Sequence, residues 1–329
     1  MPTGPSLETI RAAHERIRPH IHRTPVFTSR SLDELAGANL FFKCENLQKT
    51  GSFKIRGATN AVFSLNDEEA RRGVVTHSSG NHAAALAHAA RARGIPAWIV
   101  MPANSPMAKR KAVERYGGQI TLCEPTLAAR ETAARDLIER TGAVMIHPYN
   151  DERVIAGQAT AAVELLDQAP DLDFVLAPVS GGGLLSGTAI AAKCLRPQIR
   201  VVGCEPANAD DAFRSLQAGR ILPPEKTDTM ADGLRATLCE LTFAILRERV
   251  DEIALVSEEG IVEAMRSLWE RLKLVVEASG AVPAAPAFER RIGAHSAAGR
   301  MAGSGQAEGK RVGIILSGGN LDLANLPFK

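Results

Sequence analysis

Aromatic residues make up only 4% of this 329-residue chain, so few side chains could stack on nucleobases. The charges nearly cancel as well: 39 lysines and arginines against 37 aspartates and glutamates leave a net charge of +2. This balance creates no strong field that would attract nucleic acid or an anionic membrane. We therefore expect a protein that binds neither nucleic acid nor membranes.

Cysteine is also scarce, and its spacing excludes the common cysteine frameworks. The five cysteines are odd in number and form no C-x-x-C pair; they are Cys44, Cys123, Cys194, Cys204 and Cys239. Reduced thiols fit this pattern better than disulfides do. No apolar run approaches the ~20 residues of a membrane span, and the charged N-terminal stretch has no signal-peptide core. We expect a soluble, cytoplasmic protein.

The chain does contain a regular alternation of short β-branched runs and longer helical stretches. Its length predicts about two domains at ~150 residues each. The expected strands are residues 74–76, 98–101, 120–123, 144–146, 174–179, 201–204, 253–256 and 312–316. Helical spacing is found over residues 81–93, 107–116, 126–141, 151–168, 184–195 and 258–274. Apolar strands that alternate with helices predict an α/β fold with a parallel sheet covered on both faces.

In such sheets a ligand binds beyond the carboxyl ends of the strands, where a strand meets a helix. Three of these junctions are rich in glycine, serine and asparagine: residues 78–82 (SSGNH), 180–183 (SGGG) and 317–320 (SGGN). The stretch 293–309, rich in glycine, alanine and serine, is typical of a solvent-exposed loop before the last strand.

A lysine suited to covalent chemistry lies in the run QKTGSFKIRGA (residues 48–58). Lys54 stands at the start of a helical pattern, between Phe53 and Ile55. A helix N-terminus and apolar neighbours disfavour the ammonium form, and they lower the pKa of a lysine toward that of a nucleophilic amine. Such an amine can form a Schiff base with a carbonyl compound. Spacing alone favours the alternative, a surface lysine whose stem lies along an amphipathic helix.

The glycine run at residues 180–184 (SGGGL) directly follows the apolar strand 174–179 and opens a helix. Consecutive glycines let backbone N–H groups approach an anion, and the helix dipole adds to the attraction. A P-loop is excluded because Gly187 stands where its lysine would be needed. A dinucleotide fingerprint lacks its third glycine, at Ser186, but Glu205 follows at the expected distance. We predict a phosphate ligand, with a nicotinamide-binding domain as the competing interpretation and a turn without ligand as the simplest one.

The junction at residues 78–82 offers hydroxyls, an amide and free N–H groups, which suit a carboxylate or a phenolic oxygen. Ordinary helix capping by Ser78 or Asn81 is the alternative. His82 is expected to be structural, because its spacing from His88 does not match a zinc pair.

The segment 205–211 (EPANADD) follows the strand 201–204 and offers hard oxygen ligands. Such oxygens suit Mg²⁺, Mn²⁺ or Ca²⁺. On these residues alone, capping of a helix over 211–218 by Asp210 or Asp211 is favoured over metal binding.

Taken together, these motifs resemble the fold-type-II pyridoxal-phosphate enzymes, in particular the threonine/serine dehydratase and serine racemase group. The resemblance runs from about residue 10 to residue 323 and depends on KTGSFKIRGA, THSSGNH, HPYNDERVIAGQ, the triple glycine and SGGN in combination. It implies a two-domain, tryptophan-synthase-β-like fold of twisted, parallel-type sheets covered by helices. The large domain would comprise residues 1–72 and 151–329. The small domain would comprise residues 73–150 and contribute the Ser-Ser-Gly-Asn loop.

The resemblance implies a binding site for pyridoxal 5′-phosphate. Lys54 would carry the cofactor covalently and exchange protons at the substrate α-carbon, and Phe53 would pack beside the ring. Asn81 would hydrogen-bond the phenolic oxygen of the ring, and Ser317 would meet the pyridine nitrogen. The phosphate would be held by Gly181, Gly182, Gly183 and Leu184.

The resemblance also implies sites for a substrate and a metal. The family binds the substrate carboxylate at positions that correspond to Ser52, Ser78, Asn81 and His82. Ser79 occupies the position that serine racemase uses as a second proton donor. The divalent-metal site of serine racemase falls on Glu205, the carbonyl of Ala209 and Asp211, so we expect a bound Mg²⁺, Mn²⁺ or Ca²⁺.

The activity that the resemblance implies is an ammonia-lyase (dehydratase) reaction on L-threonine, L-serine or a related β-hydroxy amino acid, in a homodimer or homotetramer. Phe53 favours the dehydratase branch over cysteine-synthase relatives, and the neutral Ser317 should favour prompt β-elimination. Ala84 and Tyr149 depart from the pattern of many relatives at positions that concern substrate preference. Serine racemase and hydroxyaspartate or phenylserine dehydratase stay open as alternatives. From other classes, a nicotinamide-dependent oxidoreductase and a ligand-binding protein without turnover also stay open.

Overall fold

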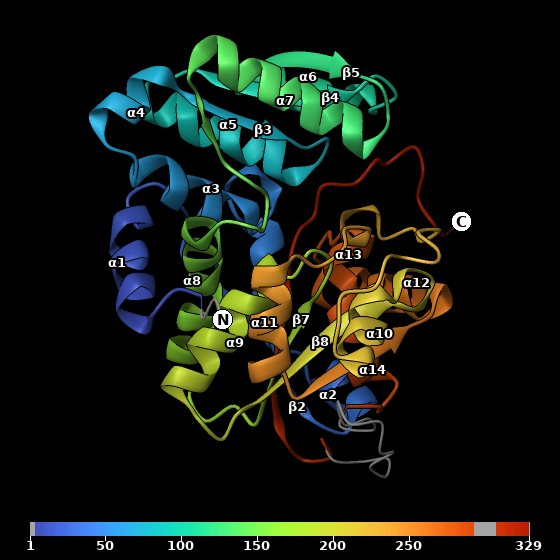
Figure 1. Cartoon of the computed structure of the whole chain (residues 1–329). Helices are drawn as coiled ribbons and strands as arrows, with labels where there is room; N and C mark the ends of the chain where they lie inside the picture. The colour runs from blue at the N-terminus through green and yellow to red at the C-terminus, as the bar shows by residue number, and fades with distance from the viewer. Residues whose placement is uncertain (1–3, 293–306, 329) are drawn as a thin grey trace.

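The computed structural model describes residues 4–292 and 307–328, and these residues form two β-sheets, each with helices on both faces (Figure 1). Among them, the larger sheet has the order β1 (Val26–Phe27), β2 (Asn39–Cys44), β10 (Arg311–Leu316), β7 (Phe174–Pro178), β8 (Arg200–Pro206) and β9 (Glu252–Val256). Its neighbouring strands are parallel except for the antiparallel pair β1 and β2. The smaller sheet is parallel, with the order β5 (Gln119–Cys123), β4 (Ala97–Pro102), β3 (Val74–His77) and β6 (Val144–Met145).

The α-helices that connect these strands are distributed along the whole described chain. Those before the smaller sheet are α1 (Leu7–Ile17), α2 (Arg30–Ala36), α3 (Lys54–Phe63) and α4 (Asp67–Arg72). Those between its strands are α5 (Asn81–Arg93), α6 (Met107–Arg115) and α7 (Leu127–Thr141). The remainder are α8 (Glu152–Gln168), α9 (Gly183–Leu195), α10 (Asp211–Ala218), α11 (Glu240–Arg249), α12 (Glu258–Ser267), α13 (Ala278–Ala281) and α14 (Ala285–Phe288).

Side-chain alternation along the large-sheet strands builds two separate cores. In β7, Leu176 packs with α2, α12 and α14, whereas Val175 packs with α8 to α11. In β10, Ile314 and Ile315 divide in the same way. Because successive side chains of a strand point to opposite faces, a run that is apolar at every position requires cover on both sides. The predicted α/β fold class is confirmed.

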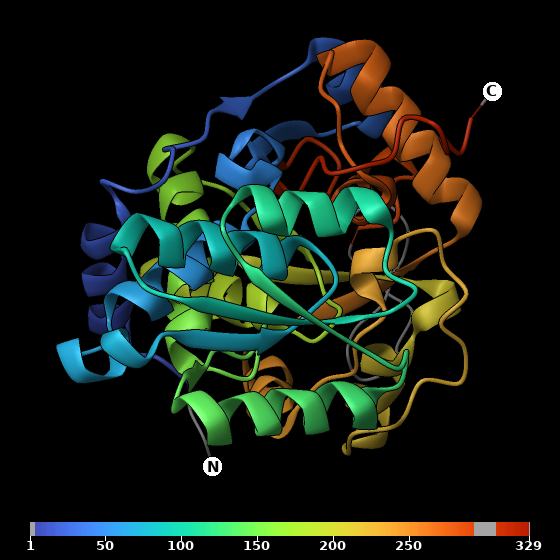
Figure 2. The ribbon, with the colours of Figure 1, turned by 90° about the horizontal axis from the view of Figure 1, so that it is seen from above.

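The smaller sheet follows the same rule. Figure 2 shows its strands between α5 and α6 on one side and α7 on the other. Ile99 packs with the α5 side and Val100 with the α7 side. Ile55 and Ala58 of α3, which precede the sheet in the chain, belong to the same hydrophobic cluster as Ile99. The division of the chain into residues 1–72 with 151–329 and residues 73–150 stays a prediction.

The predicted strands and helices agree with the structure except in a few places. The strands β1 and β2 were not predicted, and the antiparallel β1 makes the larger sheet mixed. The helix predicted over residues 258–274 ends earlier, because α12 passes into a π-turn at Leu268–Leu272 and Lys273 adopts a left-handed conformation with φ 58°. Most of the loop expected at residues 293–309 lies outside the described residues. Among the described helices, none is long and apolar enough to cross a membrane.

Candidate active site

The segments before α3 and after β10 lie side by side at the carboxyl end of the larger sheet. Ser52 pairs with Gly318 in an isolated antiparallel bridge. The backbone N–H of Phe53 donates to the carbonyl of Ser317 at 3.0 Å. The structure therefore brings together Ser52, Phe53 and Ser317, three predicted site residues from opposite ends of the chain.

Lys54 is the first residue of α3, as its position in the sequence predicted. Its Nζ donates to the carbonyl of Pro148 at 3.1 Å and lies 5.1 Å from the centroid of the Phe53 ring. Although part of the side chain is exposed to solvent, protein atoms surround the amine, and this burial lowers the pKa of Lys54 to about 8. About a tenth of such an amine is unprotonated at pH 7 and about half at pH 8, and the unprotonated form is the nucleophile.

The glycine run is shaped by backbone conformation and by a neighbouring tyrosine. Gly182 has φ +85°, in the left-handed region that favours glycine. A Cβ on Gly181 would lie 2.4 Å from Cδ1 of Tyr149, and a Cβ on Gly183 would lie 2.9 Å from Cβ of Tyr149. Gly183 begins α9, so the free N–H groups of that helix start in this loop. Leu184 is only 3% exposed, which leaves its backbone as the part that can reach an anion.

Asn81, the first residue of α5, is hydrogen-bonded to two residues that were not assigned to the site from the sequence. Its Nδ2 donates to Oε1 of Glu277 at 2.8 Å. Its Oδ1 accepts from Nδ2 of Asn320 at 3.0 Å, and the same Nδ2 donates to the carbonyl of Thr50 at 2.7 Å. The available signals were weak, because Glu277 is a single acidic residue in an apolar segment and Asn320 only ends the SGGN motif.

Histidines near Lys54 are held in the neutral form. Burial, with a smaller effect of Lys54, lowers the pKa of His82 to about 3. Burial, followed by His77 and Lys54, lowers the pKa of His147 to about 4. His82 Nε2 lies 3.2 Å from the carbonyl of Ile146, whereas its Nδ1 is buried without a hydrogen-bond partner among the described atoms. These two histidines therefore offer no charged imidazolium at neutral pH.

The remaining predicted substrate residues lie in the same region. Ser52 Oγ is buried and has no partner among the described atoms, and such groups are rare unless a ligand or water satisfies them. Ser78 and Ser79 lie partly exposed in the loop between β3 and α5. The hydroxyl of Ser78 accepts the N–H of Gly80 at 3.4 Å.

The predicted metal residues form a buried acidic pair at the carboxyl end of β8. Glu205 accepts the N–H groups of Ala212 and Phe213 at 3.1 and 2.8 Å, and Asp211 Oδ2 is buried without a partner among the described atoms. Burial raises the pKa of Glu205 to about 8, with a contribution from Asp211, and burial also raises the pKa of Asp211 to about 6. The described residues contain no group of three His, Cys, Asp or Glu side chains placed for a metal, so a cation here would also need a backbone carbonyl.

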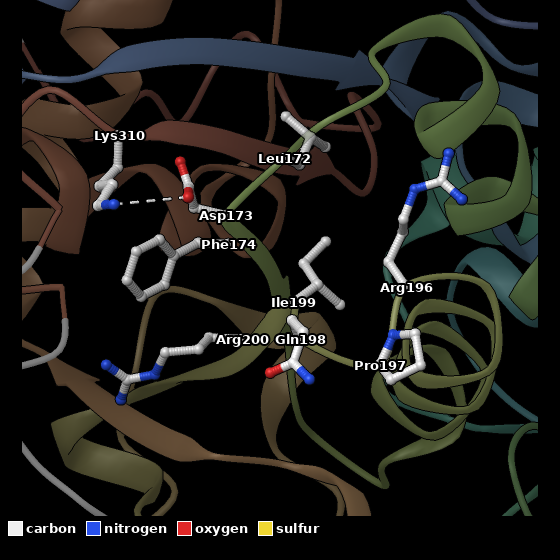
Figure 3. A pocket seen from close by; sticks show the side chains of 9 residues that line it. All are labelled: Leu172, Asp173, Phe174, Arg196, Pro197, Gln198, Ile199, Arg200 and Lys310. Atoms are coloured by element: carbon white, nitrogen blue, oxygen red, sulfur yellow. Dashed lines mark ion pairs between the residues drawn. The ribbon is translucent and has the colours of Figure 1, made fainter.

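A separate hollow of about 500 Å³ lies at the amino ends of β7 and β8, the opposite end from these loops (Figure 3). In it, Lys310 points toward Asp173, 3.7 Å away, and the Arg200 guanidinium lies 5.3 Å from the centroid of the Phe174 ring. None of the residues predicted for the active site lines this hollow.

Comparison with known proteins identifies the family. Residues 17–318 match the family model described as "Pyridoxal-phosphate dependent enzyme". The chain is 49% identical over 324 residues to beta-hydroxyaspartate dehydratase of Paracoccus denitrificans, covering 98% of this chain and 99% of that protein. It is 50% identical over 318 residues to serine racemase of Arabidopsis thaliana, covering 97% and 94% of the two chains.

Solved structures give the same result. Maize serine racemase has a TM-score of 0.92 and 47% identity, with 98% of this chain and 95% of that chain covered. The threonine deaminase of T.th. has a TM-score of 0.88 and 47% identity, with 98% and 100% covered. These matches confirm the resemblance to the serine racemase and threonine dehydratase group. They give no support to the nicotinamide-dependent alternative.

Proposed function

The chain belongs to the pyridoxal-phosphate dependent enzyme family, and from this premise we propose that it is an ammonia-lyase (dehydratase). Its substrate would be L-serine, L-threonine or a related β-hydroxy amino acid, and its products a 2-oxo acid and ammonia. Three of the relatives carry hydroxyaspartate, serine or threonine in their names, and these amino acids share a hydroxyl group on the β-carbon. The predicted neutral partner of the pyridine nitrogen, Ser317, supports elimination over longer-lived carbanion chemistry.

The observation that carries this proposal is the Lys54 amine, whose pKa is lowered by burial alone and which contacts the carbonyl of Pro148 and the ring of Phe53. The surrounding residues fit pyridoxal 5′-phosphate. The start of α9 offers N–H groups to a phosphate. One N–H of Asn81 is used by Glu277, and the other, which has no partner in the part of the chain that the structure describes, would bind the phenolic oxygen.

Pyridoxal phosphate, when bound at Lys54, would supply a ring that withdraws electrons from the α-carbon of the substrate. Lys54, as a neutral amine, takes the α-proton. The protonated Lys54 amine would return this proton to the β-hydroxyl, which leaves as water. The resulting enamine tautomerises to an imino acid, and one water hydrolyses it, so the net products are one 2-oxo acid and one ammonia. Ser52 and Ser78 would hold the substrate carboxylate together with Asn81 and His82. Because the neutral His82 ring uses its single N–H, on Nε2, for the Ile146 carbonyl, its Nδ1 can only accept; His82 would therefore contribute its backbone N–H, in the first turn of α5, to the carboxylate.

Absorbance and labelling of the purified enzyme test the cofactor assignment. We expect a band near ~410–420 nm that borohydride and Lys54→Ala each abolish. A peptide map after borohydride treatment should show the label on Lys54. A label on another lysine, or none, would refute the assignment.

Product detection tests the reaction. A panel of L- and D-β-hydroxy amino acids, including threonine, serine and 3-hydroxyaspartate, should release 2-oxo acid and ammonia in equal amounts from at least one member. Cofactor binding without release from any member would leave a ligand-binding protein and reject the enzymatic proposal. The homodimer or homotetramer stays a prediction.

We further propose a divalent cation at Glu205, the Ala209 carbonyl and Asp211. The support is a buried pair of carboxyl groups whose pKa values are raised, with Asp211 Oδ2 unpartnered among the described atoms. A cation would favour the ionised forms, so Mg²⁺, Mn²⁺ or Ca²⁺ should raise the melting temperature at pH 8 and do so less at pH 5, where protons compete. Asp211→Asn should remove this response and Glu225→Gln, an exposed control, should keep it. Insensitivity of the wild type to both added cation and EDTA would refute the site.

Serine racemase activity is a second candidate, because several of the similar proteins carry that name. Racemisation needs a proton donor on the face opposite Lys54, and Ser79 is the residue that would supply it. Chiral analysis of L-serine incubations decides the question: Ser79→Ala should abolish D-serine formation while 2-oxo acid release continues. Absence of D-serine from the wild type would reject this candidate and leave the ammonia-lyase proposal intact.

A further inference from the structure

Glu277 is a buried carboxyl group that stands directly before α13 and has no role in the assignments above. It is 7% exposed. Its Oε1 accepts Nδ2 of Asn81 at 2.8 Å, and its backbone N–H donates to the carbonyl of Gly318 at 3.0 Å. A Cβ on Gly318 would lie 2.2 Å from Glu277 Oε1. The carboxyl group of Glu277 therefore packs directly against Gly318, the residue after Ser317.

Both the nitrogen and the oxygen of the Asn81 side-chain amide are hydrogen-bonded. Glu277 takes one N–H, and the Asn320 amide donates to Oδ1 at 3.0 Å. Asn320 is itself held by the Thr50 carbonyl at 2.7 Å. If the Asn81 amide were turned over, its NH₂ group would face the NH₂ group of Asn320, and that arrangement makes no hydrogen bond. The two partners therefore select a single orientation of Asn81, in which one N–H has no hydrogen-bond partner among the described residues.

The groups that face the Glu277 carboxyl come from several parts of the chain. Asn81 lies on α5, Lys109 on α6, Asp232 in the turn Asp232–Leu234, and the backbone N–H of Asn320 follows β10. Burial, and then Asp232, raise the pKa of Glu277 to about 8, against smaller opposite effects of Asn81, Lys109 and the Asn320 N–H. Glu277 is thus mostly neutral at pH 7 and about half ionised near pH 8.

We propose that Glu277 is a positioning residue for the cofactor ring: together with Asn320 it fixes Asn81 so that the other N–H of Asn81 is presented to the phenolic oxygen. The inference rests on the proposed function, which places pyridoxal phosphate next to Asn81. Because α5 follows a strand of the smaller sheet and Glu277 packs against the end of the larger one, the same contact ties the two sheets together at the site.

Replacement of Glu277 in the holoenzyme tests this role, with Glu258→Gln as the matched control. Glu258 accepts the N–H of Met230 at 2.9 Å and belongs to α12, so the control makes the same chemical change away from Asn81. In Glu277→Ala, Asn81 loses one partner, and we expect the affinity of the apoenzyme for pyridoxal phosphate to fall about tenfold, as loss of a buried hydrogen bond predicts.

The pH dependence of the cofactor spectrum separates positioning from a merely structural effect. In the wild type the band near ~410–420 nm should shift with an inflection near pH 8, the pKa of Glu277. Glu277→Gln can still accept the Asn81 N–H but cannot ionise, so it should keep the cofactor and lose that inflection. Titration of other groups is common to both proteins and cancels in their difference.

Each result supports or overturns the inference. Wild-type spectra, wild-type pH dependence and unchanged cofactor affinity in both Glu277 variants would overturn it. If Glu277→Ala does not fold, the pH dependence of the cofactor band in the isosteric Glu277→Gln tests the inference by itself. A wild-type enzyme with no cofactor band would reject the proposed function and this inference with it, whereas a normal band with insensitive variants rejects only the role of Glu277.

Discussion

At the scale of single residues, burial accounts for most of the unusual chemistry of this site. Burial lowers the pKa of Lys54 to about 8, and burial raises the pKa of Glu277 and of Glu205 to about 8. Burial of a charged form is opposed whatever its sign, so amines and carboxyl groups shift in opposite directions. Sequence motifs identified the lysine, but the depth of each group depends on contacts between distant segments.

Cofactor uptake by the apoenzyme should depend on pH through Lys54. The pKa of this amine is lowered to about 8, so the neutral, nucleophilic form increases as the pH rises toward 8 and is nearly complete above about pH 9. We expect the rate of uptake to rise about tenfold per pH unit well below that pKa and then to level off. Stopped-flow absorbance after mixing with pyridoxal phosphate measures it. A rate that keeps rising up to the ordinary lysine pKa of about 10.4 would show that Lys54 is not perturbed.

Gly181 is required by the position of Tyr149. In Gly181→Ala the new Cβ would lie 2.4 to 2.6 Å from three ring carbons of Tyr149, too close for any side chain. We expect a loss of about 1–3 kcal/mol in the free energy of unfolding, measured by urea denaturation, together with weaker cofactor binding. Adding Tyr149→Ala should restore much of the affinity that Gly181→Ala removed. An equal effect of Gly181→Ala in both backgrounds would contradict this explanation.

At the scale of secondary-structure elements, a buried ion cluster anchors the helix that carries Lys54. Arg56 of α3 donates to both oxygens of Glu45, at 2.7 and 2.8 Å, and to both oxygens of Glu164 on α8, at 2.9 and 2.8 Å. Lys43 of β2 adds a further bond to Glu164 at 2.6 Å. Three elements are thereby joined two residues beyond the reactive lysine.

Arg56→Met should destabilise the protein strongly. It would leave Glu45 and Glu164 buried with one cation, Lys43, between them, and loss of a partner from a buried ion pair costs about 3–5 kcal/mol. Equilibrium denaturation measures the difference. Arg71→Met on the exposed side of α4 is the control, expected within about 0.5 kcal/mol of the wild type. Equal stability of the two variants would show that the cluster contributes little.

Element boundaries were largely predictable, because periodicity, capping residues and glycines act locally. Thr126 caps α7 through a hydrogen bond to Ala129 N–H, and Gly142 ends the helix with φ 66°. The strands β1 and β2 were not predicted. The two-residue β1 is too short for a hydrophobic pattern of its own and forms by pairing with β2. Pairing partners are not encoded in a local pattern.

At the scale of the whole molecule, contacts between the two sheets assemble the site. Asn81 and Lys109 belong to helices of the smaller sheet, whereas Glu277 and Asp232 belong to segments that pack on the larger one. The Asn81–Glu277 bond involves a buried carboxyl group, and the Lys109–Asp232 ion pair is partly exposed. The two contacts together join the smaller sheet to the larger one beside the site.

Lys109→Gln should weaken this arrangement slightly. A partly exposed ion pair is worth about 0–1 kcal/mol, so KM for the amino-acid substrate should rise by no more than about fivefold with kcat nearly unchanged. The difference should shrink as salt rises toward about 1 M, where the Debye length is about 3 Å. Lys111→Gln, an exposed change on the same helix, should match the wild type at all salt concentrations. A salt-independent rise in KM would point to a cause other than this ion pair.

The sequence by itself determined the fold class, most elements and the position of the reactive lysine at a helix start, because these depend on patterns that neighbouring residues create. It also indicated which strand-to-helix junctions to inspect, since ligands in parallel sheets bind beyond the carboxyl ends of the strands. Only the tertiary structure showed that Glu277 and Asn320 hydrogen-bond Asn81 and that Tyr149 packs against Gly181 and Gly183. It also decided how far burial shifts each pKa. Those properties depend on atoms that the fold brings together from segments far apart in the sequence.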